Sequence, residues 1–205
     1  MLDNSSNKTE QQILEAAYRV FQKKGRAGAR MQEIADEAGI NKSMLHYYFR
    51  NKDSLFRKIF MQSIAEFLGS VIPMLNNVET TWQEKISDFI AHYNTFLTKR
   101  PDLPLFVMNE INQHPDEFFN QLQIENILMH TVFFNQLSAA AERGEIRTIH
   151  PIQVFVTMLS NIVFPFIAAP IIKKVAAFTD SNWEHFMEDR VRITKEIIIN
   201  YLEKV

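Results

Sequence analysis

The chain has no cysteine among its 205 residues. This excludes a disulfide framework and any metal site built on thiolates. Glycine is also scarce, with five residues in all, and the residue-by-residue alternation of apolar and polar side chains that marks β-strands is absent. We therefore expect a fold without sheets.

The residue combinations typical of catalytic and cofactor sites are missing as well. We find no paired carboxylates, no Ser-His-Asp set and no phosphate-binding glycine loop, so we expect neither an enzyme nor a cofactor. Glu110 and His114 are four residues apart, but two ligands do not make a metal site, so no metal is expected. The N-terminus lacks the basic start and apolar run of a secretion signal, and we expect a cytoplasmic protein.

The charges are unevenly distributed along the chain. Residues 1–58 carry 11 Lys and Arg against 7 Asp and Glu, a net charge of +4, whereas residues 59–205 carry 11 against 17, a net charge of −6. A locally basic segment favours a polyanionic partner. We therefore expect nucleic acid to bind the first quarter of the chain and not the remainder.

One apolar segment, residues 151–172, has the length of a membrane span and is followed by two lysines. Polar residues and prolines interrupt it, among them Gln153, Asn161 and Pro165. A helix that is apolar on most faces is also typical of the centre of a folded domain. We interpret the segment as such a helix and expect no membrane partner.

Apolar residues recur with helical spacing almost throughout the chain. The sequence predicts a helix from a capping box at Thr9 to Gly25, and then helices over 31–38, 42–49 and 52–75. Further helices are expected from a Thr81–Glu84 capping box to residue 100, over 104–113, 116–143 and 151–167, and after a Ser181–Glu184 box. We predict an all-α fold with an N-terminal three-helix helix-turn-helix DNA-binding domain (1–52) and a larger C-terminal helical domain (53–205).

The second and third predicted helices and their three-residue turn have the proportions of a DNA-binding helix-turn-helix. Asn41 is a good N-cap for the third helix. Leu45 and Phe49 are four residues apart, so they face inward together, with Ile34, Ala35 and Ile40. The outward face then carries Lys42, Ser43, His46 and Tyr47, polar and aromatic groups of the kind that read the major groove.

Residues 34–55, IADEAGINKSMLHYYFRNKDSL, resemble the DNA-binding signature of the TetR family, and the resemblance extends strongly over about residues 9–57. It implies that Lys42, Ser43, His46 and Tyr47 meet bases or phosphates, and that Gln32 can reach a base. It further implies DNA-backbone contacts; the full set of expected DNA-binding residues is Arg30, Gln32, Asn41, Lys42, Ser43, His46, Tyr47, Tyr48 and Lys52.

The sequence departs from the family pattern at three positions. Arg30 stands where a Thr or Ser usually caps the second helix, so that cap is expected to be lost. Met44 replaces a small or hydroxyl residue in the reading helix and could contact a thymine methyl group. His46 replaces a more common Tyr. The operator sequence of a relative is therefore not transferable.

For the rest of the chain the resemblance implies a small-molecule sensor and a homodimer. Residues 59–205 hold 14 of the 17 Phe and 6 of the 9 Met, residues that line apolar pockets as well as ordinary cores. The expected partners are a palindromic operator DNA, a small hydrophobic ligand and a second copy bound through the last two helices. The alternative is a small-molecule-binding or interaction module that has lost DNA binding. The expected ligand-pocket residues are Phe67, Phe89, Tyr93, Met108, Asn112, His130 and Phe133.

Overall fold

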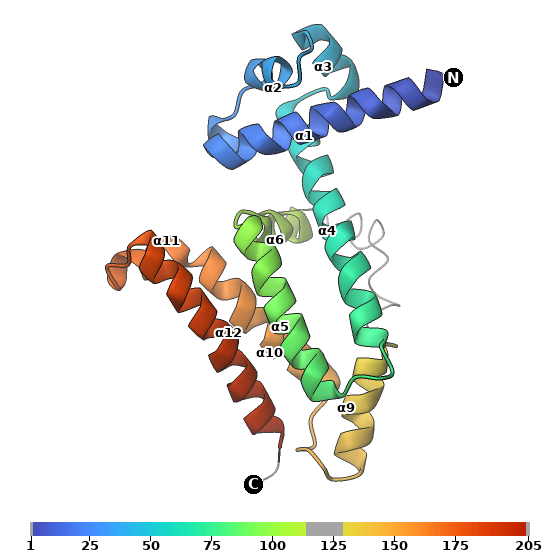
Figure 1. Ribbon diagram of the computed structural model, residues 1–205, viewed down its shortest axis with the longest axis vertical. Coiled ribbons are helices and arrows are strands. Elements are labelled where there is room, and N and C mark those ends of the chain that lie inside the picture. Colours follow the sequence, from blue (N-terminus) through green and yellow to red (C-terminus); the bar gives the residue numbers. More distant parts are fainter. Residues whose placement is uncertain (1, 114–128, 204–205) are drawn as a thin grey trace. The chain divides into compact units, whose positions relative to one another are not determined.

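The computed structural model describes residues 2–113 and 129–203 (Figure 1), and over these residues every regular element is a helix. This confirms the all-α prediction. One isolated antiparallel β-bridge joins Ile146 to Glu203. The helices are α1 (Leu2–Gly28), α2 (Met31–Glu37), α3 (Lys42–Tyr48), α4 (Lys52–Asn76), α5 (Trp82–Lys99), α6 (Leu103–Gln113), α9 (Val132–Glu142), α10 (Pro151–Ile167), α11 (Ala169–Val175) and α12 (Asp180–Leu202).

The chain divides into two compact units, Met1–Glu66 (unit 1) and Phe67–Val205 (unit 2). The division lies inside α4, whereas the sequence suggested a boundary at the start of that helix. The first turns of α4 bury Leu55, Phe56 and Ile59, and the Phe56 ring packs edge-on against Phe21 of α1, with the centroids 5.0 Å apart. Apolar burial of this kind makes the first half of α4 part of unit 1.

The first helix is longer than the sequence predicted. It begins at Leu2, so the expected start at Thr9 is wrong; neither proline nor glycine precedes Thr9 to end the helix there. Gly25 does break the helix, because its φ of 65° lies in the left-handed region that glycine adopts without strain. A further helical turn follows and extends to Gly28.

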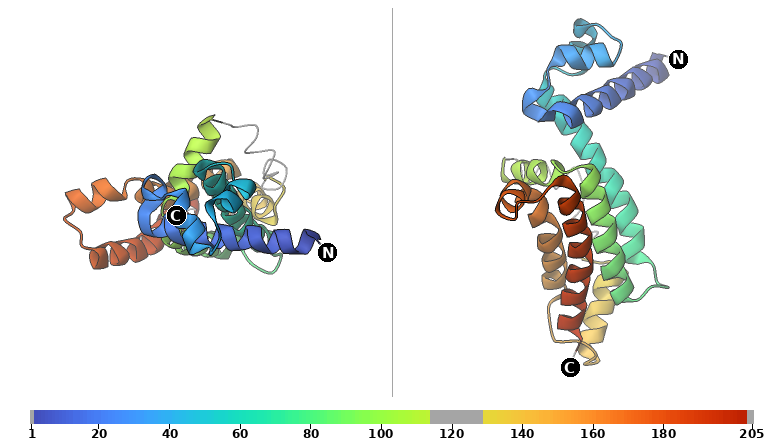
Figure 2. Two further views of the ribbon diagram at one scale, coloured as in Figure 1. Left: turned by 90° about the horizontal axis from the view of Figure 1, so that it is seen from above. Right: turned by 60° about the vertical axis from the view of Figure 1, so that its left-hand side comes forward.

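In unit 2, α5, α10 and α12 lie side by side (Figures 1 and 2). The predicted capping box at the start of α5 is confirmed: Glu84 N–H donates to Thr81 Oγ1 (3.2 Å), and Thr81 N–H donates to Glu84 Oε2 (2.7 Å). The two backbone donors are thereby satisfied reciprocally. The carboxylate's hydrogen bonds from Thr81 also lower the pKa of Glu84.

Two of the expected helix boundaries in unit 2 are wrong. Residues 129–131 form a turn and α9 starts at Val132, so a single helix over 116–143 is excluded, while its first part lies outside the described residues. The N-cap of α12 is Thr179, whose hydroxyl accepts from Asn182 N–H at 3.2 Å, and not Ser181. A Thr two residues earlier offers the same kind of cap, and sequence alone does not choose between them.

The apolar segment 151–172 forms parts of two helices, because α10 ends at Ile167 and α11 leaves it at an angle of 67°. By length and composition, α4 and the bent pair of α10 and α11 reach the values of membrane spans. Buried helices in the core of a folded protein reach the same values. In α10, Val154, Met158 and Ile162 are buried by the protein itself.

Candidate nucleic-acid interface

The structure confirms the geometry of the two short helices of unit 1. Gly39, with φ of 67°, allows the chain to turn sharply after α2, and Ile40 N–H donates to Ala35 O at 3.0 Å. Asn41 caps α3 as predicted, since its Oδ1 accepts from Met44 N–H at 2.7 Å. On the inner face Leu45 is completely buried. The turn and the cap therefore fix the start of α3, and Leu45 fixes which face is buried.

The other face of α3 is open to solvent. Lys42, Ser43 and His46 are exposed, and Tyr47 is 84% exposed. Among the described residues the Tyr47 ring packs edge-on with the ring of Tyr48, with the centroids 5.3 Å apart. A tyrosine gains most when its ring is covered and its hydroxyl is bonded, so the exposed Tyr47 ring is available to an external partner.

The His46 ring has a defined orientation on this face. Its Nδ1 lies 3.2 Å from the carbonyl oxygen of Arg50. Because a carbonyl oxygen can only accept, this contact requires the ring proton on Nδ1. The neutral ring then has Nε2 as a free acceptor.

Many basic side chains of unit 1 are already paired with carboxylates of the same unit. A hydrogen bond and the charge of Lys24 lower the pKa of Glu33, and those of Arg19 lower the pKa of Glu37. Both carboxylates therefore stay ionised and are neutralised within unit 1. The pairs are Arg19–Glu37 (2.7 Å), Lys24–Glu33 (2.8 Å), Arg26–Asp53 (3.0 Å) and Lys58–Glu10 (3.6 Å).

Around the motif, Arg30, Lys42 and Arg50 are exposed and form no ion pair with any described residue. Arg30 immediately precedes α2, Lys42 is the first residue of α3, and Arg50 follows α3 by two residues. Their positions bracket the two helices of the motif. Arg50 was not among the residues expected to bind DNA. The feature that could have pointed to it is a basic residue shortly after the reading helix.

Arg30 does not cap α2 with its side chain, in line with the expectation that the usual cap is lost. The helix start is nevertheless partly satisfied, because Arg30 N–H donates to Glu33 Oε2 at 3.3 Å. Glu33 also adds negative charge to the first turn, which the helix dipole favours. The Arg30 guanidinium is therefore left for other contacts.

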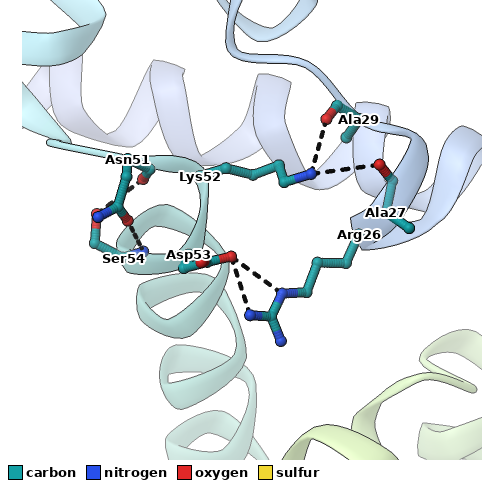
Figure 3. Close-up of polar contacts among 7 residues, drawn as sticks. All are labelled: Arg26, Ala27, Ala29, Asn51, Lys52, Asp53 and Ser54. Atoms are coloured by element: carbon teal, nitrogen blue, oxygen red, sulfur yellow. Dashed lines mark hydrogen bonds and ion pairs between the residues drawn. The ribbon is translucent and has the colours of Figure 1, made fainter.

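Lys52 has an internal role in this structure (Figure 3). Its Nζ donates to the carbonyl oxygens of Ala29 (3.1 Å) and Ala27 (3.4 Å), which end α1 and join it to α2. Next to it, Arg26 pairs with Asp53. The expected backbone-gripping lysine thus holds the start of α4 to the segment between α1 and α2.

The remaining expected DNA-binding residues have partners of their own. Gln32 Nε2 donates to Asp36 Oδ1 at 2.8 Å, so a contact with a base would require this bond to break. Asn41 is occupied as the cap of α3. Tyr48 is half-buried.

The expected ligand-pocket residues gather only in part. Phe67 of α4 has its ring centroid 4.5 Å from that of Tyr93 and 6.4 Å from that of Phe89, both on α5. Phe96 and His92 of α5 also lie against Phe67, at 4.6 Å and 5.7 Å. Burial raises the pKa of Tyr93 to about 12. Phe67, Phe89, Tyr93 and Phe96 are called the aromatic cluster below.

The other expected pocket residues lie elsewhere. Phe133 is completely buried and packs edge-on against Phe134 (5.8 Å). Met108, Asn112 and His130 are exposed in the described structure. Among the described residues no three His, Asp or Glu side chains gather as a metal site would require, while Glu110 and His114 lie outside the side chains described.

A buried inner face, a capped three-residue turn and an exposed cationic outer face define unit 1 as a helix-turn-helix domain of the DNA-binding type. Residues 13–59 match the family model described as bacterial regulatory proteins, tetR family. Solved structures of TetR type resemble the chain along nearly its whole length. Residues 13–59 therefore carry the TetR-family DNA-binding region, and the described structure has the fold of TetR/AcrR-type regulators.

Two curated relatives are the HTH-type transcriptional repressor SCO4008 of Streptomyces coelicolor and the HTH-type transcriptional repressor NicS of Pseudomonas putida. The first is 33% identical over 43% of this chain and 46% of its own length, the second 37% identical over 30% and 29%. The chain thus matches half or less of these relatives' length.

Among solved structures, a TetR transcription regulator from Haloarcula marismortui superposes with a TM-score of 0.68 at 19% identity, covering 96% of this chain and 100% of its own. A TetR/AcrR-family regulator from Thermobifida fusca gives 0.67 at 17% identity, covering 91% and 96%. At this identity the likeness shows the fold.

Proposed function

We propose that the chain is a DNA-binding transcriptional regulator, most simply a repressor, that reads its operator with α3. The observation that carries the proposal is the combination on one short helix of a buried face anchored by Leu45 and an open face presenting Lys42, His46 and Tyr47. A helix of this size fits the major groove, where base edges differ in their donors and acceptors. Because its target is operator DNA, we place the protein in the cytoplasm.

The open face suggests a division of roles. Arg30, Lys42 and Arg50 have no carboxylate partner among the described residues, so phosphates can take them without breaking an existing pair. His46, with the proton on Nδ1, offers Nε2 as an acceptor to an exocyclic amino group of adenine or cytosine. Exposed Met44 can contact a thymine methyl group. Phosphate contacts set the register of the helix, and His46 and Met44 contribute sequence preference.

Fluorescence anisotropy with the DNA upstream of the chain's own gene tests this assignment. Lys42→Gln and Arg50→Gln should each weaken binding and lower the slope of log K against log salt by about 1, because each removes one phosphate contact. Lys174→Gln on α11 is the matched control, since it changes net charge equally on an exposed residue of unit 2. Equal slopes for all three variants would contradict the assignment.

We further propose that a second copy binds through α10 and α12. These helices pack together and leave Val156, Phe164 and Ile197 more than half exposed. Beside them Gln153, Thr157 and Tyr201 line a groove of about 500 Å³. Two copies are also what operator binding requires, because one short helix contacts only a few base pairs and a palindrome offers two half-sites.

Light scattering during gel filtration tests the pairing surface. Val156→Glu places a charge in the proposed interface and should shift the chain to a monomer with greatly weakened operator binding. Val78→Glu, on a more exposed valine outside α10 and α12, should remain a dimer. A dimer that survives Val156→Glu and Phe164→Glu together would exclude this surface.

We propose that unit 2 senses a small hydrophobic ligand at the aromatic cluster. Phe67 belongs to α4, the same helix whose first residue, Lys52, holds the end of α1. A ligand that displaces Phe67 would therefore act on α4 directly. It can release the operator only if it binds the two states of the protein with different affinity.

Operator titrations with a panel of hydrophobic compounds test sensing, with Phe89→Ala as the variant. Compounds that weaken operator binding by the intact protein should lose potency on this variant. A panel that leaves operator affinity unchanged would argue against sensing, without affecting the DNA-binding proposal.

The alternative is a small-molecule-binding module that has lost DNA binding. Its main support in the sequence is the absent Arg30 cap, and the Glu33 contact with Arg30 N–H weakens that support. Absence of any binding to upstream DNA at low salt would favour this alternative. An enzyme is a poorer interpretation, because the matched relatives carry the names of transcriptional repressors.

A further inference from the structure

The contact that orients the His46 ring also decides which of its nitrogens can change its protonation. Nδ1 lies 3.2 Å from the carbonyl oxygen of Arg50, which can only accept, so Nδ1 carries a proton in both the neutral and the charged ring. A second proton can therefore be taken up only at Nε2, the nitrogen at the tip of the ring. Because His46 is exposed, this nitrogen is open to an external partner.

Within the described part of the chain, no carboxylate pairs with His46. The carboxylates of α2, which packs against α3, and of the start of α4 are held by other side chains: Glu33 by Lys24, Asp36 by Gln32, Glu37 by Arg19 and Asp53 by Arg26. The other charged or titratable side chains of α3 and its flanks are Lys42, Tyr47, Tyr48, Arg50 and Lys52. The protonation of His46 is therefore not set by an internal ion pair.

Protonation exchanges the hydrogen-bonding role of Nε2. In the neutral ring Nε2 accepts a hydrogen bond, and in the charged ring it donates one. In the major groove cytosine presents only a donor, its N4 amino group, whereas guanine presents only acceptors, N7 and O6. A histidine changes its charge between about pH 5 and 8. The same side chain can therefore suit cytosine at one pH and guanine at another.

We propose that His46 is a two-state reader of one base in each half-site. Where the ring is neutral, the protein prefers cytosine at this base, and where the ring is charged, it prefers guanine. Adenine presents both a donor and an acceptor and should discriminate least between the two states. This inference rests on the proposed function, because it requires α3 to lie in the major groove.

The linkage between protonation and base preference fixes the sign of the pH effect. A guanine operator binds the charged ring, so its affinity relative to a cytosine operator rises as the pH falls. The two complexes differ by at most one proton, so the ratio of their affinities should change by at most about tenfold per pH unit. At either end the preference should be about threefold to tenfold, the worth of one net hydrogen bond.

Fluorescence anisotropy with variants of the upstream DNA tests the proposal on the full chain. Each base pair of the half-site is replaced in turn, symmetrically in both half-sites. Affinities are measured at about pH 5.5 and about pH 8, the two sides of histidine titration, at one ionic strength because salt alters every protein–DNA complex. One position should change its preference from cytosine at the higher pH to guanine at the lower pH. Comparing two operators at the same pH cancels the pH effects that arise elsewhere in the protein.

His46→Gln is the decisive variant, since an amide offers a donor and an acceptor at both pH values. It should show the same base preference at both. His185→Ala is the matched control, because His185 is an exposed histidine of α12 and its loss should leave the change of preference intact. A change of preference that survives in His46→Gln overturns the proposal.

Long-range ¹H–¹⁵N correlation spectra of the histidine rings test the premise without DNA. The His46 signals, identified by their loss in His46→Gln, should show the neutral ring with its proton on Nδ1. A proton on Nε2 overturns the two-state reader and leaves the proposed function untouched, as does operator binding with the same preference at both pH values. Absence of operator binding at both pH values overturns the proposed function and this inference together.

Discussion

The two units of the chain place polar groups differently. In unit 1, polar side chains without a partner among the described residues lie on the surface, among them Lys42 on the open face of α3, Arg30 and Arg50. In unit 2 polar groups are buried: Lys85, Thr131 and Thr194 are each at most 2% exposed. Exposed polar side chains are available to an external partner, whereas buried polar side chains must be satisfied by distant parts of the same chain or by a small bound species.

Lys85 illustrates the buried kind. Its Nζ donates to Thr80 O (2.5 Å), to Asn77 O (2.6 Å) and to Thr80 Oγ1 (2.7 Å), so a fully buried ammonium is satisfied by the segment that joins α4 to α5. Gln136 of α9 donates to the same Thr80 carbonyl at 2.8 Å. This segment therefore ties three helices together through polar contacts.

The largest effect is expected from the anchor of the reading helix. Leu45→Ala removes a completely buried side chain from unit 1 and should lower the free energy of unfolding by about 3 kcal/mol, through lost burial and the cavity left behind. Met44→Ala, on the adjacent exposed residue, should change it by less than about 0.5 kcal/mol. Urea denaturation measures both, and equal losses would show that the two faces of α3 are not distinct.

Lys85→Met should lower the free energy of unfolding by about 2–3 kcal/mol, because it leaves buried carbonyl oxygens without a donor. The intact protein should also show a pH effect. Burial lowers the pKa of Lys85 below its ordinary value of 10.5. In the alkaline window just below 10.5 the unfolded chain therefore binds more protons than the folded one, and stability from this group rises with pH.

The pH effect of Lys85 is measured as the difference between the intact protein and Lys85→Met in urea denaturation from neutral to alkaline pH. The gap between the two should widen as the pH rises through this window. A constant gap would mean that Lys85 titrates alike in the folded and unfolded chains.

His46→Ala should weaken binding to the preferred operator by about 1–2 kcal/mol and reduce discrimination among bases at one position. Its stability should hardly change, since His46 is exposed. His185→Ala on α12 serves as control, being an exposed histidine outside unit 1. Preserved affinity and base preference in His46→Ala would remove this residue from the readout.

The smallest effect at neutral pH is expected from Tyr93→Phe, below about 0.5 kcal/mol, because the aromatic packing is retained. A difference should appear in alkali. Burial raises the pKa of Tyr93 to about 12, above its ordinary value of 10.0. The unfolded chain therefore loses the phenolic proton first, and stability from this group falls as pH rises between these values. Tyr93→Phe should lack that loss of stability. If urea denaturation shows the same alkaline pH dependence for the intact protein and for Tyr93→Phe, the Tyr93 hydroxyl lies in water.

The reading motif could be predicted because each of its determinants is local. Leu45 lies on the inner face of α3 by helical spacing, and Asn41 caps that helix by accepting from Met44 N–H, three residues later. The TetR-family resemblance added expected DNA contacts to residues that helical spacing had already placed on the exposed face. Arg50 was missed because a single basic residue after a helix has no distinctive spacing.

Contacts between distant residues could not be predicted in this way. Lys52 was assigned to DNA by resemblance, yet its ammonium bonds to Ala29 O, 23 residues earlier. The aromatic cluster joins α4 to α5, while Met108 and His130, which looked equivalent in sequence, are exposed. Burial and pocket lining leave the same apolar pattern, so only packing distinguishes them.

The sequence by itself determined the helices, the turn at Gly39 and the two faces of α3, because backbone preference and side-chain periodicity act over a few residues. Only the tertiary structure decided which cations are already neutralised, which of the phenylalanines meet, and that Arg190 contacts Asn161, 29 residues earlier, and no carboxylate among the described residues. Such pairings depend on how whole helices pack, and their energies become large only where packing has excluded water.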